Sequence, residues 1–316
     1  MSDKLGSEMK DTDNITLANA DPDQELVSVL KRDISEEIFK TMRVPRIGFL
    51  RKTITQSLSQ PIGNFCTFIA RVDALVKSQG IRGAAHFAVE KLSRGVESVG
   101  EEAIPSDGPL LFASNHPGTY DSLAILSRLP RDDTKVVVSG IPFFRNLPNA
   151  AKHFIFTSID IPDRMNVIRK AIRHLQEGGS LLIFPSGRID PDPSIFPNAE
   201  TQFSHWSRSV EVFLKKAPQT RLVLSIASGV LSRDFVGHPL ARLFKKGSHE
   251  RLRVMEFMQV IKQMARCLPV ELNPKITFSE PIRAEALFPA GTLIPDQTIK
   301  ETAKWLLNEH ISHFYI

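Results

Sequence analysis

From residue 100 onward, short apolar runs alternate with segments of helical periodicity, and this alternation constrains the fold more than any other feature. One helical segment, for example, begins near Asp163 and ends at Gly178 and Gly179. Strands that alternate with helices predict an α/β fold with a mixed, largely parallel sheet, flanked by helices and buried on both faces. The expected strands are residues 109–114, 135–138, 153–157, 180–184, 222–226 and 275–279, and further helices are expected over 121–129 and 297–311.

The first third of the chain has a different character. Residues 1–24 are acidic and lack periodicity, so we expect a disordered acidic tail. Residues 25–98 have a helical pattern with frequent bases and no clear strand, which predicts a helical basic region in front of an α/β domain over 99–316. Ten bases against three acids over 40–100 indicate an anionic partner, such as lipid headgroups, nucleic acid or a charged cofactor, unless the charges form an ordinary solvated surface.

One stretch of this region has the pattern of a basic amphipathic helix. It could lie in the interface of an anionic membrane, or it could pack on a neighbouring part of the protein. Its apolar residues are Ile47, Leu50 and Ile54, and the bases beside them are Arg43, Arg46, Arg51 and Lys52.

The cellular location is constrained by three features that the sequence lacks: a secretory signal, a membrane-spanning segment and a disulfide framework. The polar first residues contain no apolar core of a secretory signal, and no stretch approaches the roughly 18 apolar residues of a spanning helix. The two cysteines, Cys66 and Cys267, have neither a disulfide framework nor metal-ligand spacing, which suits a reducing compartment. We therefore expect a cytoplasmic protein, either soluble or peripheral on a membrane.

The segment from Asn115 to Asp121 is the strongest candidate for chemistry. It follows an apolar strand and opens a helix, at the strand end where open α/β sheets bind ligands. His116 and Asp121 can meet if the histidine lies in the loop and the aspartate in the first helical turn, and Pro117 and Gly118 permit that bend. The imidazole could then take a proton from a substrate hydroxyl while the carboxylate holds its other nitrogen. The alternative is a turn histidine followed by an aspartate that is favoured at a helix start in any case.

The same residues resemble the glycerolipid acyltransferases, whose first motif is N-H-x-x-x-x-D. That family includes the 1-acylglycerol-3-phosphate and glycerol-3-phosphate acyltransferases. The similarity covers roughly residues 98–285 and keeps the motif order of the family. The segments that carry it are residues 100–105, 108–121, 141–144, 153–164, 178–188, 224–227 and 275–282.

The resemblance implies an O-acyltransferase of phospholipid biosynthesis with His116 as general base and Asp121 as its orienting partner. The implied donor is an acyl thioester of coenzyme A or acyl carrier protein, the implied acceptor is a lysophospholipid or glycerol phosphate, and no metal or redox cofactor is implied. The implied substrate-binding residues are Ser186, Gly187, Arg188 and Arg164, with Arg145 as the alternative to Arg164.

The sequence departs from the family pattern in the third and fourth motifs. Ser186 replaces the glutamate of F-P-E-G, Arg188 follows Gly187 directly, and Ser225 stands near the usual proline of the fourth motif. Arg188 could grip a phosphate or could pair with Asp190 or Asp192 close by.

The sequence motifs leave two other functions open and argue against several more. A non-catalytic lipid-binding protein of the same fold and a thioester hydrolase are the remaining alternatives. The sequence has no G-x-S-x-G elbow, no P-loop and no nucleic-acid-binding module. His310 and His313 are expected to be a surface pair rather than a metal site, and residues 240–246 could touch a membrane or the donor's phosphates or form a plain surface helix.

Overall fold

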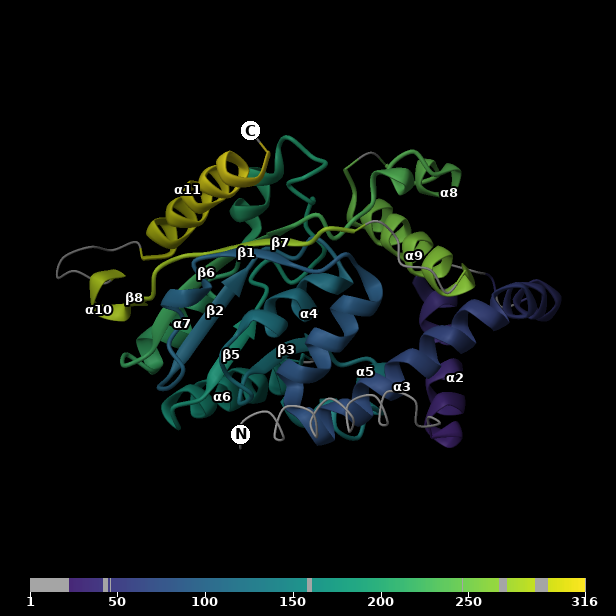
Figure 1. The fold of residues 1–316 in the computed structure, drawn as a ribbon, viewed down its shortest axis with the longest axis horizontal. Coiled ribbons are helices and arrows are strands. Elements are labelled where there is room, and N and C mark those ends of the chain that lie inside the picture. The colour runs from purple at the N-terminus through teal and green to yellow at the C-terminus, as the bar shows by residue number, and fades with distance from the viewer. Residues whose placement is uncertain are drawn as a thin grey trace, which may run out of the picture.

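A computed structural model describes residues 23–41, 45, 47–157, 161–245, 247–266, 272–287 and 295–315. Its centre is an eight-stranded sheet in the order β1-β7-β6-β2-β5-β3-β4, with β8 also paired to β6 (Figure 1). The expected acidic tail falls almost entirely outside the described residues. The strands are β1 Glu97–Val99, β2 Leu110–Ser114, β3 Lys135–Ser139, β4 Phe154–Thr157, β5 Ser180–Ile183, β6 Arg221–Ser228, β7 Lys275–Phe278 and β8 Ile282–Arg283.

The sheet is mixed and largely parallel, as the sequence predicts. Strands β6, β2, β5, β3 and β4 run parallel to one another, whereas β7 and β8 pair antiparallel with β6. In the centre, Leu110 of β2 lies opposite Ser180 of β5 on one side and Arg221 of β6 on the other. The carboxyl ends of these three strands therefore lie at one edge, and the loops that follow them are neighbours.

Helices cover both faces of the sheet, and β2 contributes side chains to both layers. Leu110 and Phe112 belong to an apolar cluster that includes residues of α2, α3, α4 and α5 (Pro142–Arg145), while Leu111 and Ala113 belong to a second cluster that includes residues of α6, α7 and α11. All four side chains are fully buried, which explains why a central parallel strand is apolar without alternation. The helices of eight or more residues are α2 Gln24–Thr41, α3 Gly48–Leu92, α4 Thr119–Arg128, α6 Ile161–Gln176, α7 Ser209–Lys216, α9 His249–Arg266 and α11 Pro295–Tyr315.

Short helices complete the chain. They are η1 Glu101–Ala103, α5 Pro142–Arg145, η2 Ala150–His153, η3 Ala199–His205, η4 Arg233–Phe235, α8 Pro239–Arg242 and α10 Ala284–Leu287.

The long helix α3 is interrupted at Gly80, whose φ of 74° is left-handed. A Cβ at this position would collide with the carboxylate of Asp132, which accepts a hydrogen bond from the backbone N–H of Arg82 at 3.1 Å. A glycine is therefore required at the break, and Asp132 caps the part of the helix that resumes after it.

Several sequence expectations differ from the structure in detail. Helix α6 begins at Ile161, so Asp163 lies inside its first turn rather than at its N-cap. Strand β1 crosses the boundary between the expected helical region 25–98 and the expected domain 99–316, and the sequence predicts no strand there because three residues are too few to show a periodicity. His310 is fully buried, so the expected surface pair of His310 and His313 is wrong. Its imidazole is held by hydrogen bonds with Ser228 and Thr277, at 2.7 Å and 2.8 Å.

Candidate active site

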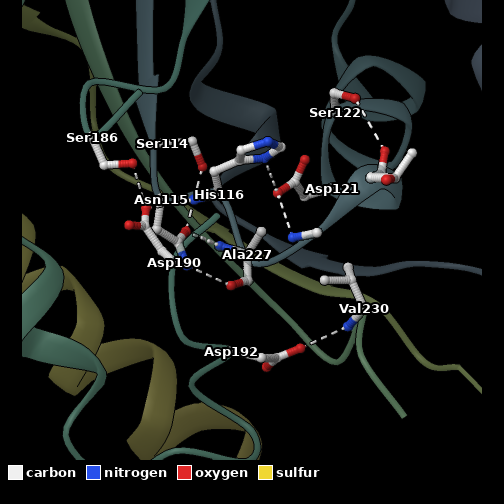
Figure 2. A network of polar contacts seen from close by, with 12 residues as sticks. Ser114, Asn115, His116, Asp121, Ser122, Ser186, Asp190, Asp192, Ala227 and Val230 are labelled. Carbon is white, nitrogen blue, oxygen red and sulfur yellow. Dashed lines mark hydrogen bonds and ion pairs between the residues drawn. The ribbon is translucent and has the colours of Figure 1, made fainter. Parts of the chain in front are cut away.

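The expected His116–Asp121 pair is formed at the carboxyl end of β2. His116 lies in the loop after the strand and Asp121 in the first turn of α4, and His116 Nδ1 is 2.8 Å from Asp121 Oδ2 (Figure 2). The Asp121 side chain is fully buried, whereas that of His116 is 27% exposed. The pair thus combines a shielded carboxylate with an imidazole that a substrate can reach.

Local geometry favours this placement of Asp121. Its Oδ2 also accepts the backbone N–H of Gly118, the N-cap of α4, at 3.2 Å. An acid at this helical position satisfies a free amide and interacts favourably with the helix dipole. The same oxygen therefore caps the helix and holds the histidine.

The hydrogen bond to Asp121 fixes which imidazole nitrogen is available. An ionised carboxylate can only accept, so Nδ1 of His116 carries a hydrogen, and in the neutral ring Nε2 presents a lone pair. The ring stacks on Phe184, with centroids 4.4 Å apart and planes inclined by 29°. Within the described part of the chain, Nε2 has no hydrogen-bond partner, so it is the atom that could take a proton from a substrate.

Asn115 joins the end of β2 to β6. Its Nδ2 donates to the carbonyl of Ala227, and its Oδ1 accepts the N–H of Ala227, both at 2.8 Å. Next to it, the hydroxyl of Ser114 donates to the carbonyl of Ser225 at 3.1 Å. The residues before His116 are thereby anchored to the neighbouring strand, so the loop begins from a fixed point.

The loop after β5 packs directly beside His116. Asp190 Oδ2 accepts the backbone N–H of His116 and the hydroxyl of Ser186, each at 3.0 Å. The Ser186 oxygen also lies 2.9 Å from the carbonyl oxygen of Arg188, so its one hydrogen is shared between the two acceptors, and Gly187 provides the left-handed turn with a φ of 65°. Ser186 and Gly187 thus shape this loop, and the hydroxyl of Ser186 is engaged within it.

Arg188 is half-buried in this loop. Its guanidinium pairs with no carboxylate among the described residues, including Asp190 and Asp192. Asp192 instead accepts the backbone N–H groups of Gly229, Val230 and Leu231, each at 3.0 Å. The structure therefore leaves the Arg188 guanidinium available to an anion.

Of the two candidate arginines of the second motif, only Arg145 has a described side chain, and it makes its contacts outside this network. The Arg164 side chain falls outside the described residues, although its backbone lies in α6. Arg145 donates to the carbonyl of Gly140 at 2.8 Å and stacks over Phe156 at 4.6 Å.

Comparison with known proteins agrees with the motif resemblance. The sequence profile of the Acyltransferase family matches residues 95–267, which is more than half of the chain and includes the His116–Asp121 pair. The chain belongs to the Acyltransferase family. No curated protein matches it significantly. Among solved structures, it is similar to the 1-acyl-sn-glycerophosphate (LPA) acyltransferase PlsC from Thermotoga maritima, with a TM-score of 0.45, 15% identity and coverage of 78% of this chain and 80% of that chain.

Three carboxylates set the electrostatics around His116. Burial by itself lowers the pKa of His116, but the charge and hydrogen bond of Asp121 outweigh it, and Glu256 and Asp190 act in the same direction. Together they raise the pKa of His116 to about 9. Burial also raises the pKa of Asp190, to about 6, although hydrogen bonds from His116 and Ser186 favour its ionised form.

Glu256 was not found by the sequence reasoning. It lies on α9, outside the recognised motifs, and is 8% exposed. Burial raises its pKa above the ordinary value, and the donors of Thr119 oppose that effect. The signal that could have found it is a helical row of polar residues, Glu256, Gln259 and Gln263, in an otherwise apolar face.

The described part of the chain contains no cluster of three or more potential metal ligands. It also contains no helix that is both long and apolar enough to cross a membrane.

Proposed function

We propose that this acyltransferase transfers a fatty acyl group from a thioester to a hydroxyl of a lysophospholipid or glycerol phosphate, in phospholipid biosynthesis. The observation that carries the proposal is the 2.8 Å contact between His116 and Asp121, which leaves Nε2 facing away from the carboxylate at the carboxyl edge of the sheet. No protein nucleophile is needed, since the acceptor supplies its own hydroxyl.

The reaction proceeds by proton transfer and displacement. Nε2 of His116 takes the hydroxyl proton while the acceptor oxygen forms a bond to the thioester carbonyl carbon. Asp121 stabilises the imidazolium that results. The tetrahedral intermediate then collapses, the C–S bond breaks, and the thiolate leaves with the proton from Nε2. The products are an ester and a free thiol, and the sequence of steps balances without a metal or a redox cofactor.

The position of Arg188 is the reason to propose an acceptor that carries a phosphate. Its guanidinium has no carboxylate partner in the described chain, and its loop is bonded to the backbone of His116 through Asp190. A planar guanidinium can hold phosphate oxygens in a bidentate manner. A phosphate held there would place a nearby hydroxyl beside the imidazole. Gly187, which precedes Arg188, lets the backbone approach the acceptor; for Arg164 the assignment as a substrate-binding residue stays a prediction.

Product analysis tests this function. Radiolabelled acyl-coenzyme A and acyl-(acyl carrier protein) are each incubated with lysophosphatidic acid, glycerol 3-phosphate or monoacylglycerol, and products are separated by chromatography. We expect label in a phosphorylated ester and its loss in the His116→Ala variant. Release of free fatty acid alone would identify a thioester hydrolase, and no turnover with retained lipid binding would identify a non-catalytic lipid-binding protein.

We also propose that the protein binds the surface of anionic membranes as a peripheral protein. At the start of α3, Ile47 and Phe49 are 57% and 82% exposed, and Lys52 is exposed beside them. The same stretch also faces the protein, because Ile54 lines a small pocket together with Ser35, Ile38 and Phe39 of α2. Apolar side chains with neighbouring bases suit an interface of anionic lipid.

Sedimentation with vesicles tests this membrane proposal. Vesicles of phosphatidylglycerol and phosphatidylcholine should bind the protein more than phosphatidylcholine alone, and added salt should weaken the binding. Phe49→Ser should reduce binding, and the matched exposed apolar residue Trp305 on α11 gives the control, Trp305→Ser, which should not. Equal binding to both vesicle types at all salt concentrations would contradict the electrostatic part.

A further inference from the structure

A buried row of polar side chains runs along one face of α9. Glu256, Gln259 and Gln263 are spaced at helical intervals and are 8%, 0% and 2% exposed. Each makes hydrogen bonds to a different part of the protein. Gln259 binds the backbone of Val230 and Ser232 after β6, Gln263 binds the hydroxyl of Tyr120 and the carbonyl of Leu92, and Glu256 binds Thr119.

Glu256 contacts the turn that carries the catalytic pair. Its Oε1 accepts both the backbone N–H and the hydroxyl of Thr119, the first residue of α4. A Cβ on the preceding Gly118 would lie 3.4 Å from the same oxygen, so the carboxyl group is packed against the backbone between His116 and Asp121. An acid that is buried at this point is costly unless charge or hydrogen bonds compensate it.

The compensating positive charge is His116. The acidic groups that face this imidazole are Asp121 from α4, Asp190 from the loop after β5, and Glu256 from α9. The groups that face Glu256 are His116 and Asp121, together with the donors of Thr119 and the neighbouring phenol of Tyr120. Asp121 is committed to the hydrogen bond, and Asp190 is bonded to the backbone of His116. Glu256 is thus a third acid that faces the imidazole without a hydrogen bond to it.

From this arrangement we propose that Glu256 is a positioning residue, which holds the turn at Thr119 and stabilises the imidazolium that forms when His116 takes the acceptor's proton. The catalytic part of this inference, stabilisation of the imidazolium during acyl transfer, rests on the proposed function. It adds a residue from α9, about 140 positions away in the sequence, to a pair that the first motif supplies alone.

The direct test is a pH titration of His116 itself, monitored by NMR of histidine-labelled protein. The chain has nine histidines, so a His116→Asn variant assigns the resonance. Glu256→Gln keeps an oxygen acceptor for Thr119 and removes the charge, and should lower the midpoint of His116 by about one pH unit. The matched control is Glu250→Gln, which removes the same charge from an exposed position in the first turn of α9 and should shift the midpoint by less than about 0.2 unit. An unchanged or raised midpoint in Glu256→Gln would overturn the proposal.

A second variant keeps the proposal testable if Glu256→Gln does not fold. Thr119 is exposed, so Thr119→Ala should preserve the fold while removing one donor that favours the ionised Glu256. Its His116 midpoint should fall in the same direction by a smaller amount, about 0.3 unit. A midpoint within about 0.1 unit of the parent's would overturn the proposal in that case.

Kinetics give the readout for catalysis. In Glu256→Gln the rise of kcat/KM with pH should move to lower pH by the same amount, and its alkaline plateau should fall about threefold because the base is weaker. A uniform loss at every pH, with no movement of the midpoint, would mark Glu256 as merely structural. Absence of transfer by the parent protein would contradict the proposed function, and the NMR titration would still decide the relation between Glu256 and His116.

Discussion

Asp190 and His116 are joined by two reciprocal hydrogen bonds. The carboxylate of Asp190 accepts the backbone N–H of His116 at 3.0 Å, and the backbone N–H of Asp190 donates to the carbonyl of His116 at 2.7 Å. The loops after β2 and β5 are therefore fixed to each other at His116, the residue that we propose as the general base. Arg188 lies two residues before Asp190, so the same contact fixes the backbone that carries it.

His116→Ala should abolish acyl transfer without unfolding the protein. The imidazole is partly exposed and packs mainly on Phe184, so its loss removes little core. Loss of a general base costs about 10²–10⁴-fold in rate. Initial rates, together with the thermal melting curve, measure both effects. Activity within about threefold of the parent would remove His116 from the mechanism.

Asp121→Asn should also impair transfer. An amide in place of the carboxylate can donate to Nδ1, which moves the hydrogen to Nε2 and leaves no lone pair for the substrate. Loss of the charge also makes the imidazolium less stable. We expect kcat to fall about 100-fold or more, with a smaller effect on KM. A variant with the parent's kcat would show that the carboxylate has no role in the reaction.

The pH dependence of kcat/KM should reflect the raised pKa of His116. The base works only when neutral, so activity should be low at acidic pH and rise through a midpoint of about 9. The free energy of unfolding changes with pH in the opposite direction. The protonated imidazole stabilises the fold below about pH 6.5, its ordinary pKa, and this contribution is lost as the pH rises through about 9. A kcat/KM profile with its midpoint at or below pH 6.5 would contradict the arrangement of carboxylates around His116.

Asp192→Asn should destabilise the fold by about 2–4 kcal/mol, because five donors converge on this fully buried carboxylate. They are the N–H groups of three consecutive residues after β6, together with the N–H and hydroxyl of Ser194. An amide has one oxygen and its NH₂ group would face a donor. Denaturant unfolding measures the loss, and Asp234→Asn, at an exposed carboxylate, is the control, with an expected change below about 0.5 kcal/mol. Equal stability of the two variants would contradict the role of Asp192.

The sequence predicts those parts of the molecule that depend on local pattern. The six longer strands are apolar because both faces of the sheet are covered, and the meeting of His116 with Asp121 follows from a bend that Pro117 and Gly118 allow. Contacts between distant segments have no such local signal. Glu256 reaches Thr119 only because α9, which packs on α3, passes the first residues of α4, and Asp190 and Asp192 bind backbone amides rather than the arginine close to them in sequence. The two-residue strand β8 depends on its pairing with β6 and not on its own residues.

Arg188 tests the class of acceptor. If its guanidinium holds the acceptor's phosphate, Arg188→Ala should raise the KM for the acceptor about tenfold or more and lower kcat if the hydroxyl is misplaced, while the KM for the donor stays near the parent's value. Arg188→Lys keeps the charge without the planar fork, so it should restore only part of the loss.

The matched control for Arg188 is Arg283→Ala. Arg283 is an exposed arginine on β8, opposite Arg221 at the amino end of β6 and thus at the sheet edge opposite to His116, and its removal should leave both KM values unchanged. The decisive comparison varies acceptor and donor separately, with monoacylglycerol as the phosphate-free acceptor. A change confined to the donor KM would assign Arg188 to the thioester instead. Equal use of monoacylglycerol and lysophosphatidic acid by the parent would mean that the protein recognises no phosphate on its acceptor. That result would contradict the role proposed for the Arg188 guanidinium.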